Sequence, residues 1–434
     1  MLVLVFAAVF LTLVSSLAGY IFVEKRAQLS KENREKALHI AEAGLEYYRW
    51  FLAHFPDDLQ NGTGNPGPYE HTVTDPEGGT LGTFSLNVTG EELCGSLASV
   101  EIESTGWTAA DPSLTRTVAA SYTRPSVAEF SHIVDSNVWA GSDRVISGPY
   151  HSNQGVRMDG THNATVSSGV TSWTCTSSFG CSGTQTVDGV FGNGGPQELW
   201  EFPVPQVDFA GVTVDIATLQ DYADDEGGIY YGPAGGQSNR RGYHAIFNSD
   251  GTVTIYRVTD TIEYWGYSTA EGWEEEYNLI DDETLLGTFD IPETCPVVFF
   301  RDRVWVEGVV SGKVVLVGAN VQSSQYNPDV ILEGNITYAN GSDVDGLTVI
   351  AENNILVGLS VPNVMTINGI FIAQEGRFGR NHYQTAGSYD VPTSYNGYVL
   401  RDTLNTNGTV VSKGRVGTKW TCSGSYCSGF SQRN

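Results

Sequence analysis

The sequence predicts an α+β protein in which one long N-terminal α-helix is followed by a mostly-β globular body. Three observations predict this class. The first 23 residues are apolar and uncharged, the next stretch carries apolar positions at helical spacing, and the remainder alternates short apolar runs with turns rich in glycine, asparagine and aspartate. For the body we expect a right-handed parallel β-solenoid with an insertion, and an irregular β-sandwich is the alternative.

The composition bounds the size and the partners of the protein. Its 434 residues suffice for two or three domains. Only 17% of them are charged, and the formal net charge is -27. Nucleic acid is therefore not expected as a partner, because phosphate binding requires clustered lysine and arginine. A solvated acidic outer domain accounts for this charge, since it stays soluble and repels its neighbours except at specific contacts.

The first segment, residues 1–23, contains neither charge nor proline. At about 1.5 Å per residue it is long enough to cross a hydrocarbon layer of roughly 30 Å. A secretory signal would carry a basic region before the apolar run and a small-residue cleavage site after it, and neither is obvious here. A simple membrane anchor remains an alternative.

The helix is expected to continue to about residue 55. From Glu24 to Phe55 there is no proline, and Glu32 and Lys36 form a favourable i,i+4 pair. Pro56 then ends the run. Apolar or small positions recur mostly at steps of three and four, and we expect them to form a stripe against a globular domain: Ala37, Ala41, Gly44, Leu45, Tyr48, Leu52 and Phe55.

This half-apolar, half-amphipathic helix resembles the first helix of type IV pilins and type II secretion pseudopilins. The stretch AEAGLEYYRW, residues 41–50, is similar to the N-terminal signature of PilX-type minor pilins. The resemblance implies a non-enzymatic structural subunit without a cofactor. It would be anchored in the inner membrane before assembly and would then join an extracellular filament on the bacterial cell surface. Its partners would be copies of itself or other pilins.

The resemblance also implies roles for particular residues. A prepilin peptidase would make Met1 the first mature residue and Met1 would be N-methylated; an initiator Met1 is the alternative. Major pilins usually carry a glutamate where this sequence has Val5, and a proline where it has Phe22. Minor pilins of the type II secretion tip also lack that glutamate, so a major and a minor role both stay open. The residues expected to pack in the filament core are Met1, Leu4, Val5, Phe6, Ala7, Ala8, Ala18 and Gly19.

Behind the helix, the patterns predict a small pilin-like module and a larger body. Three alternating runs, TFSLNV, SVEIEST and TRTVAASYT, are expected to form an antiparallel sheet after a loop over 57–80. Apolar runs centred near Val315, Ile331, Ile350 and Ile370 recur at roughly 16 to 20 residues, which suits solenoid rungs. The expected division is 1–55 for the helix, 56–130 for the β module, 131–400 for the solenoid-like body, 196–295 for a subdomain inserted in it, and 401–434 for a disulfide-stapled tail.

The six cysteines favour disulfides over a metal. Cys175 and Cys181 lie six residues apart, and Cys422 and Cys427 lie five apart, so each pair is expected to form a local disulfide. Cys94 and Cys295 would pair with each other or remain free. No Cys-x-x-Cys motif occurs, and we expect no metal site.

An enzyme is not expected, although parallel β-helices often belong to polysaccharide lyases and hydrolases. No nucleophile elbow, zinc-protease motif, phosphate loop or dinucleotide fingerprint occurs. The acidic turns 224–228 and 340–346 lack the full spacing of a Ca²⁺ loop. The alternative function is a minor or tip pilin, or a membrane-tethered surface adhesin that binds carbohydrate. Polar candidates for chemistry on the body are Asp143, Asp159, Glu307, Glu333, Asp343 and Asp345, with His151 and Arg157.

Overall fold

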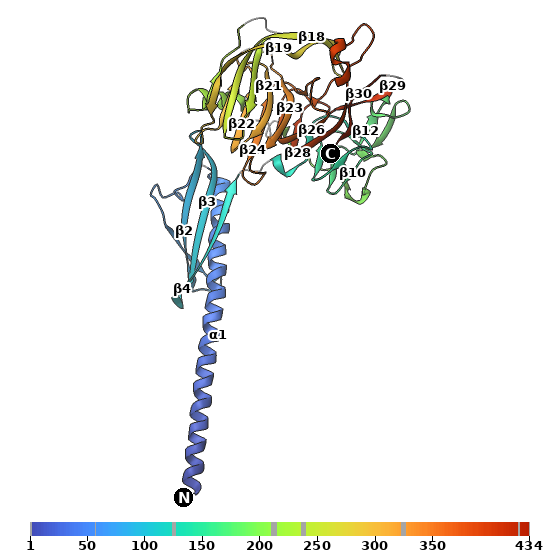
Figure 1. The fold of residues 1–434 in the computed structure, drawn as a ribbon. Helices are drawn as coiled ribbons and strands as arrows, with labels where there is room; N and C mark the ends of the chain where they lie inside the picture. The colour runs from blue at the N-terminus through green and yellow to red at the C-terminus, as the bar shows by residue number, and fades with distance from the viewer. Residues whose placement is uncertain are drawn as a thin grey trace. The chain divides into compact units, whose positions relative to one another are not determined.

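The protein forms two compact units, Met1–Pro125 and Ser126–Asn434, in the computed structural model (Figure 1). The structure describes the backbone but not the side chains of the residues at 96–98, 421–423, 426–427 and 433. The described residues are 2–56, 58–123, 127–209, 215–235, 240–322, 327–423 and 426–433. The finer division into four segments and an insertion stays a prediction.

The first unit begins with a single helix, α1 (Leu2–His54), as predicted. The buried positions of α1 fall in its second half, mostly at steps of three and four: Ala37, Ile40, Ala41, Gly44, Tyr48 and Phe51. The predicted stripe missed Ile40 and Phe51. Leu45 and Leu52 are only half-buried. Phe55 lies beyond the end of the helix and leaves the stripe, with 52% of its surface exposed.

A four-stranded antiparallel sheet in the order β1-β2-β3-β4 packs on this stripe: β1 (Tyr69–Thr74), β2 (Thr80–Leu93), β3 (Ser96–Thr108) and β4 (Asp111–Thr123). The three predicted strands are confirmed, but the prediction of an uninterrupted loop over 57–80 was wrong, because β1 lies inside it. The short alternation YEHTVT was masked by the surrounding glycine and proline. The shared core of helix and sheet includes Tyr48, Phe51, Phe84, Leu86 and Ile102.

The second unit is built almost entirely from strands. Its first strands are short, namely β5 (His132–Val134), β6 (Val138–Ala140), β7 (Val145–Ile146), β8 (Tyr150–Ser152), β9 (Val156–Met158), β10 (Thr161–His162), β11 (Val166–Ser168), β12 (Ser172–Cys175), β13 (Gln185–Asp188), β14 (Val190–Phe191) and β15 (Trp200–Glu201). The later strands before the tail are β16 (Ile229–Tyr231), β17 (Gly242–Phe247), β18 (Thr252–Ser268), β19 (Gly272–Asp290), β20 (Val297–Phe300), β21 (Val304–Val310), β22 (Lys313–Gly318), β23 (Val330–Tyr338), β24 (Gly346–Ala351), β25 (Ile355–Val357), β26 (Val364–Ala373) and β27 (Phe378–Gly379). Its helical segments are η1 (Val127–Glu129), η2 (Ser177–Phe179), η3 (Gln197–Leu199), α3 (Ile216–Asp224) and η4 (Thr393–Tyr398).

From β20 to β26 each strand pairs in parallel with the next strand but one. The tail strands are β28 (Leu400–Ser412), β29 (Lys419–Ser423) and β30 (Tyr426–Arg433), of which β28 and β30 continue this parallel pairing. Among the earlier strands, β5, β8, β11 and β15 pair in parallel in that order. The register of these parallel strands aligns side chains in rows across neighbouring strands. The longest row runs through β16, β20, β22, β24, β26, β28, β5, β8, β11 and β15 as Ile229, Val298, Leu316, Val349, Phe371, Val410, His132, Tyr150, Val166 and Trp200. A second row, Ala245, Val306, Leu332 and Val357, joins β17, β21, β23 and β25.

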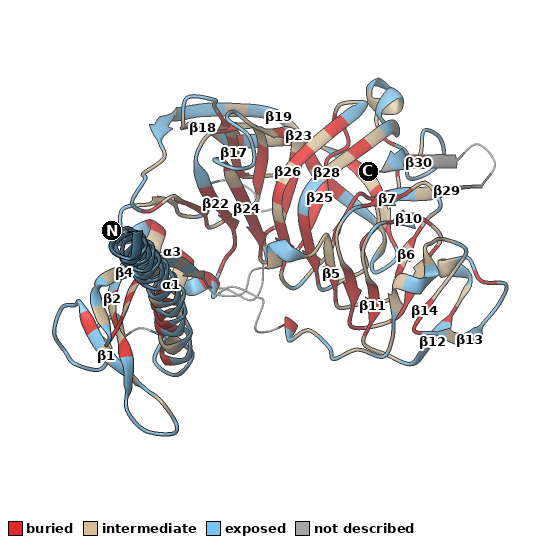
Figure 2. Cartoon of the chain, turned by 90° about the horizontal axis from the view of Figure 1, so that it is seen from below, coloured by how far each residue is buried: buried red, intermediate tan, exposed pale blue. Residues whose placement is uncertain are grey.

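These rows form the core of the second unit. Members such as Leu316, Val349 and Phe371 are fully buried, because inward side chains of one strand stack on those of the next. Figure 2 shows this burial along β22, β24, β26 and β28, and it shows α1 mainly exposed. The long helix and the mostly-β body are as predicted, whereas a solenoid path with right-handed turns stays a prediction.

Several strand pairs depart from the parallel pattern. Strands β18 and β19 form a long antiparallel hairpin, to which β17 adds on the β18 side, and the pairs β12–β13 and β29–β30 are also antiparallel. The segment 196–295, expected as an insertion, also contributes β16 and β17 to the parallel pairing through β20 and β21. The segment therefore shares the sheet network of the body.

Candidate functional site

The first half of α1 has the clearest functional character in the chain. Leu4 is 75% exposed, Val5 61% and Phe6 68%. The helix contains an 18-residue window of mean hydropathy 2.5 with none of it buried, so by length and composition it can cross a membrane. So large an exposed apolar surface normally marks a contact with lipid or protein.

The structure places most of the predicted packing residues on this exposed half. Leu4, Val5, Phe6, Ala7, Ala8, Ala18 and Gly19 are all exposed there. A Cβ atom on Gly19 would meet nothing within 4 Å, so space around it is open. Met1 lies outside the described residues.

The exposed half of α1 is an unbroken helix whose side chains present little polarity. Thr12 donates its hydroxyl hydrogen to the carbonyl oxygen of Val9 at 2.8 Å, which satisfies that donor within the helix. A helix pairs its own backbone groups, so it can enter an apolar medium without unpaired N–H and C=O groups along its length. The segment from Ser15 to Gly19 is helical like the residues on either side of it.

Charged residues mark the change from the exposed to the folded half. Lys36 and Glu32 form an ion pair at 2.7 Å, and this contact lowers the pKa of Glu32. Further along, Tyr48 donates to the carbonyl oxygen of Asp58 at 3.1 Å, and the ring of Tyr47 lies 4.4 Å from that of His71. The second half of α1 is thus fixed to its own sheet, while the first half has no such cover.

The candidate carboxyls Glu307 and Glu333 come together on neighbouring strands. Both line a groove of about 700 Å³ in the second unit. Ser360 donates to Glu333 at 2.6 Å, and burial raises the pKa of Glu333 to about 7. Sequence reasoning missed His244, whose Nδ1 lies 3.0 Å from Glu283 and whose Nε2 lies 3.5 Å from Glu307. No local motif could reveal it, because its partners lie 39 and 63 residues away, at positions 283 and 307.

This cluster holds a proton more tightly than isolated carboxyls would. Burial lowers the pKa of His244, but the hydrogen bonds and charges of Glu307 and Glu283 outweigh burial and raise it. The result is a histidine that holds its proton more strongly than a free imidazole, beside a carboxyl that holds its proton more strongly than a free carboxyl. Such a pair can bind polar groups, and it also neutralises charge within the sheet.

The other polar candidates are engaged in the structure itself. Asp159 accepts from Arg157 and from the Trp139 indole, both at 2.8 Å. Asp345 accepts from the backbone N–H of Gly312 at 2.8 Å and from that of Asn340, which closes the turn at 340–346. Asp343 is exposed on the same turn. Asp159 and Asp345 therefore stabilise loops.

The motif GPYHSN, residues 148–153, is a structural junction. His151 is buried, with Nδ1 2.9 Å from the Ser167 hydroxyl and Nε2 2.9 Å from Asn153 Oδ1. Asn153 in turn donates to Asp135 at 2.8 Å and to the carbonyl oxygen of Val207 at 2.9 Å. Burial lowers the pKa of His151, which therefore stays neutral near pH 7.

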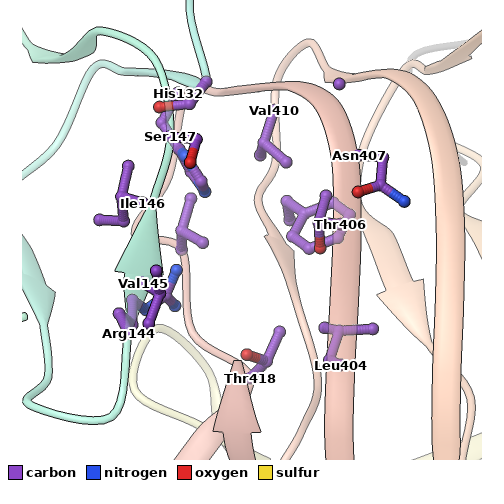
Figure 3. Close-up of a pocket in the computed structure, with 14 residues that line it drawn as sticks. His132, Arg144, Val145, Ile146, Ser147, Leu404, Thr406, Asn407, Val410 and Thr418 are labelled. Carbon is purple, nitrogen blue, oxygen red and sulfur yellow. The ribbon is translucent and has the colours of Figure 1, made fainter. Parts of the chain in front are cut away.

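A further pocket of about 420 Å³ lies between β7 and β28 (Figure 3). Apolar side chains such as Val145, Leu404 and Val410 line it together with Arg144 and His132. Burial, and then the charge of Arg144, lowers the pKa of His132 to about 3, so this imidazole is uncharged. The pocket therefore offers a mixed lining without a matched pair of catalytic groups.

The cysteines are oxidised where the structure describes them. Cys175 and Cys181 form a disulfide. Cys94 and Cys295 each take part in a disulfide, so the alternative that they are free is wrong. The side chains of Cys422 and Cys427 lie outside the description. In the described part of the chain, no group of three histidine, cysteine or acidic residues could hold a metal ion.

Comparison with known proteins gives no family. No family model matches the chain, and no curated protein matches it. The chain is similar to the crystal structure of the competence-associated pilin ComZ from Thermus thermophilus, with 13% sequence identity over 92% of this chain and 90% of that one. The TM-score is 0.27, which is too low to establish a shared fold. The functional argument therefore depends on the geometry of the chain.

Proposed function

We propose that this protein is a structural, non-enzymatic subunit of a type IV pilus-like extracellular filament. One observation carries the proposal: α1 is a single 53-residue helix whose apolar first half is uncovered while its second half is packed on a sheet. A filament subunit needs both properties in one helix. The buried half ties the helix to the folded unit, and the bare half remains available to lipid and then to other copies.

The physical chemistry of the bare half supports assembly. Leaving this surface in water is unfavourable, because each Å² of apolar area costs about 25 cal/mol. Lipid covers it before assembly, and neighbouring helices cover it in a filament. Between helices that leave lipid, association depends on close packing at small residues. Ala7, Ala8, Ala18 and Gly19 supply such residues, and Met1, Leu4, Val5 and Phe6 form the leading end.

The location follows from the same helix. Before assembly the subunit is anchored in the inner membrane, with the acidic second unit outside. In the filament the second unit coats the surface, and the acidity of the whole chain, with a net charge of -27, disfavours non-specific association. N-methylation of Met1 belongs to this proposal, as does the partnership with further copies or with other pilins.

The body of the subunit is proposed to be a right-handed parallel β-solenoid. Parallel pairing between alternate strands, from β20 through β22 and β24 to β26, supports this path. Right-handed crossovers are the general rule for parallel strands in one sheet. In the tail, the β29–β30 hairpin is proposed to carry a Cys422–Cys427 disulfide, while pairing of Cys94 with Cys295 stays a prediction.

A Phe6→Asp variant tests the filament proposal. A charge at this position is costly in lipid and among packed helices, so filaments should disappear from sheared cell-surface material. Phe6→Leu is the matched control, because it keeps the position apolar and should assemble normally. The Cys175–Cys181 bond and the thermal transition of the body should be unchanged in both variants. Normal filaments in the Phe6→Asp strain would overturn the proposal.

The second candidate is a minor or tip pilin, or a membrane-tethered surface adhesin that binds carbohydrate. The uncharged Val5 favours it, because the resemblance associates a major subunit with a glutamate at this place. Copy number separates the two candidates. A major subunit should dominate the protein of sheared filaments, and N-terminal sequencing of that band would identify a methylated Met1. A scarce band would favour the second candidate.

A further inference from the structure

One hollow of the second unit concentrates basic side chains in a strongly acidic protein. Its volume is about 530 Å³, within the range of about 300–1,000 Å³ typical of small-molecule sites. Arg377, Arg415 and Lys419 all line it, although the chain has only 23 lysine and arginine residues against 50 acidic ones. Segments far apart in the sequence, from residue 139 to residue 420, converge here.

Basic side chains outnumber acidic ones in the lining of this pocket. Its one acidic lining residue is Asp143, whose carboxylate lies 3.2 Å from the Lys419 ammonium group. Arg415 donates to the carbonyl oxygen of Ser178 at 2.9 Å, and Arg377 donates to the Asn381 side chain. Both acceptors are neutral, so these two hydrogen bonds hold the guanidinium groups in place without cancelling their charge. The charge of Arg377 also acts on the buried carboxyls of Glu276 and Asp329, where it opposes the rise in pKa that burial causes.

Aromatic rings form the second property of the pocket. Trp139, Tyr267 and Trp420 line it, and each is half-buried. The rings of Tyr267 and Trp420 lie 5.6 Å apart at an angle of 73°. Each ring system therefore has part of its surface packed in the protein and part left accessible.

The protein holds these groups in position before any ligand arrives. The indole N–H of Trp420 donates to the carbonyl oxygen of Arg380 at 2.9 Å, and that of Trp139 donates to Asp159 at 2.8 Å. The loop closed by the Cys175–Cys181 disulfide supplies one wall, where Arg415 also stacks on the Phe179 ring at 4.2 Å. Preorganised groups lose little entropy on binding, which favours affinity.

The combination of cations and rings specifies a class of ligand. Guanidinium groups pair with carboxylates through charge-assisted hydrogen bonds. Aromatic faces pack against the C–H faces of a sugar ring. A simple inorganic anion would not use the rings, and a neutral sugar would not use the cations. We propose that this pocket binds a carboxylated saccharide, such as a uronate.

This site deepens the carbohydrate-binding candidate function, because it names the pocket and the ligand class, and it does not depend on filament assembly. The general acidity of the chain opposes the approach of an anion. At physiological ionic strength, however, salt screens exposed charges that are more than about 8 Å from the ligand. The contacts inside the pocket therefore decide the affinity.

Calorimetric titration of the full chain in detergent micelles tests the site. Three probes share a ring number, and only the first is charged: trigalacturonate, its methyl ester and maltotriose. Trigalacturonate should bind, and the other two should bind at least about tenfold more weakly, because each guanidinium group would lose its charged partner. Comparable binding of the methyl ester, or equal competition by inorganic sulfate, would overturn the ligand class.

Three variants test the pocket. Arg415→Gln should weaken trigalacturonate binding about tenfold or more. Asp143→Asn should strengthen it by about threefold, since it removes the opposing carboxylate. This gain cannot come from misfolding. Lys313→Gln removes an exposed cation that does not line the pocket, and it should leave binding unchanged.

Two results would sink this assignment. They are unchanged affinity in Arg415→Gln and weaker affinity in Asp143→Asn. The filament proposal has its own readout, because Phe6→Asp should abolish filaments and leave trigalacturonate binding intact. Filaments that persist in Phe6→Asp would therefore count against the filament proposal alone, and failure of trigalacturonate to bind would count against the pocket proposal alone.

Discussion

In the first unit, a Cβ atom built on Gly106 of β3 would lie 2.4 Å from the backbone nitrogen of Ala41 in α1. The strand and helix backbones therefore approach each other more closely than any side chain at position 106 permits. Gly106→Ala should force the sheet away from the helix and lower the free energy of unfolding of this unit by about 2 kcal/mol. Glu103→Ala, on the exposed face of the same strand, should change it by less than about 0.5 kcal/mol. Thermal melting followed by circular dichroism measures both, and equal effects would contradict the close approach.

The stability of the second unit should fall as pH rises through the titration of Glu333. Its pKa is raised by burial to about 7 from an ordinary value of 4.5. Between these values the folded state retains a proton that the unfolded state releases, so the contribution is complete below about pH 4.5 and lost above about pH 7. The change is at most about 3.5 kcal/mol, since one pKa unit corresponds to about 1.4 kcal/mol.

Glu333→Gln isolates this effect, because an amide does not titrate. The difference in unfolding free energy between the original protein and the variant should change across pH 4.5 to 7. Glu293→Gln alters an exposed acid of the same unit and serves as the control. Curves that stay parallel for the original protein and Glu333→Gln would show that Glu333 titrates normally.

Removing the Cys175–Cys181 disulfide should loosen one corner of the second unit. The bond closes a loop with a sequence separation of 6, for which chain entropy gives about 2 kcal/mol. The double variant Cys175→Ser, Cys181→Ser should melt at a lower temperature. It should also bind trigalacturonate more weakly, because this loop forms a wall of the basic pocket. Calorimetry of melting and of binding measures the two losses, and full retention of both would contradict the role of the loop.

Arg380 is a buried cation that joins several chain segments. It is fully buried and donates to the carbonyl oxygens of Leu359 at 3.0 Å, Tyr398 at 2.8 Å and Gly358. Arg380→Met leaves these carbonyls without their donor and should cost about 3 kcal/mol of unfolding free energy. Arg401→Lys, at the surface, should cost less than about 1 kcal/mol. Chemical denaturation compares them, and a neutral Arg380→Met would show that packing alone holds these segments.

Features that depend on local sequence patterns could be predicted from the sequence. Helical spacing gave α1 over nearly its full length, and alternation gave β2, β3 and β4. These patterns repeat every few residues, so they can be recognised without knowing which segment packs against them. The strand β1 escaped because it is short and lies among turn residues. Ile40 and Phe51 were missed because the sheet that buries them covers a wider part of the helix than the predicted stripe.

Sites assembled from distant segments could not be predicted from local patterns. Trp139 and Trp420 line one pocket although they lie 281 positions apart in the sequence. Asp159 was a candidate for chemistry because it is a carboxyl near a turn. Its bonds to Arg157 and Trp139 show why a carboxyl cannot be assigned before its neighbours are known. Only three-dimensional register brings such groups together.

The pairing of β28 with β5 bears on when the second unit can fold. Val410 lies opposite His132, and Thr409 donates to the carbonyl oxygen of Phe130 across 279 positions of sequence. The other edge of β5 pairs with β8, which follows closely in the sequence. A ribosome must therefore release almost the whole polypeptide before the earliest strand of this unit meets its second neighbour, β28. Nascent chains stalled short of residue 400 would display two unpaired strand edges, which are ready templates for aggregation and so for recognition by chaperones and proteases.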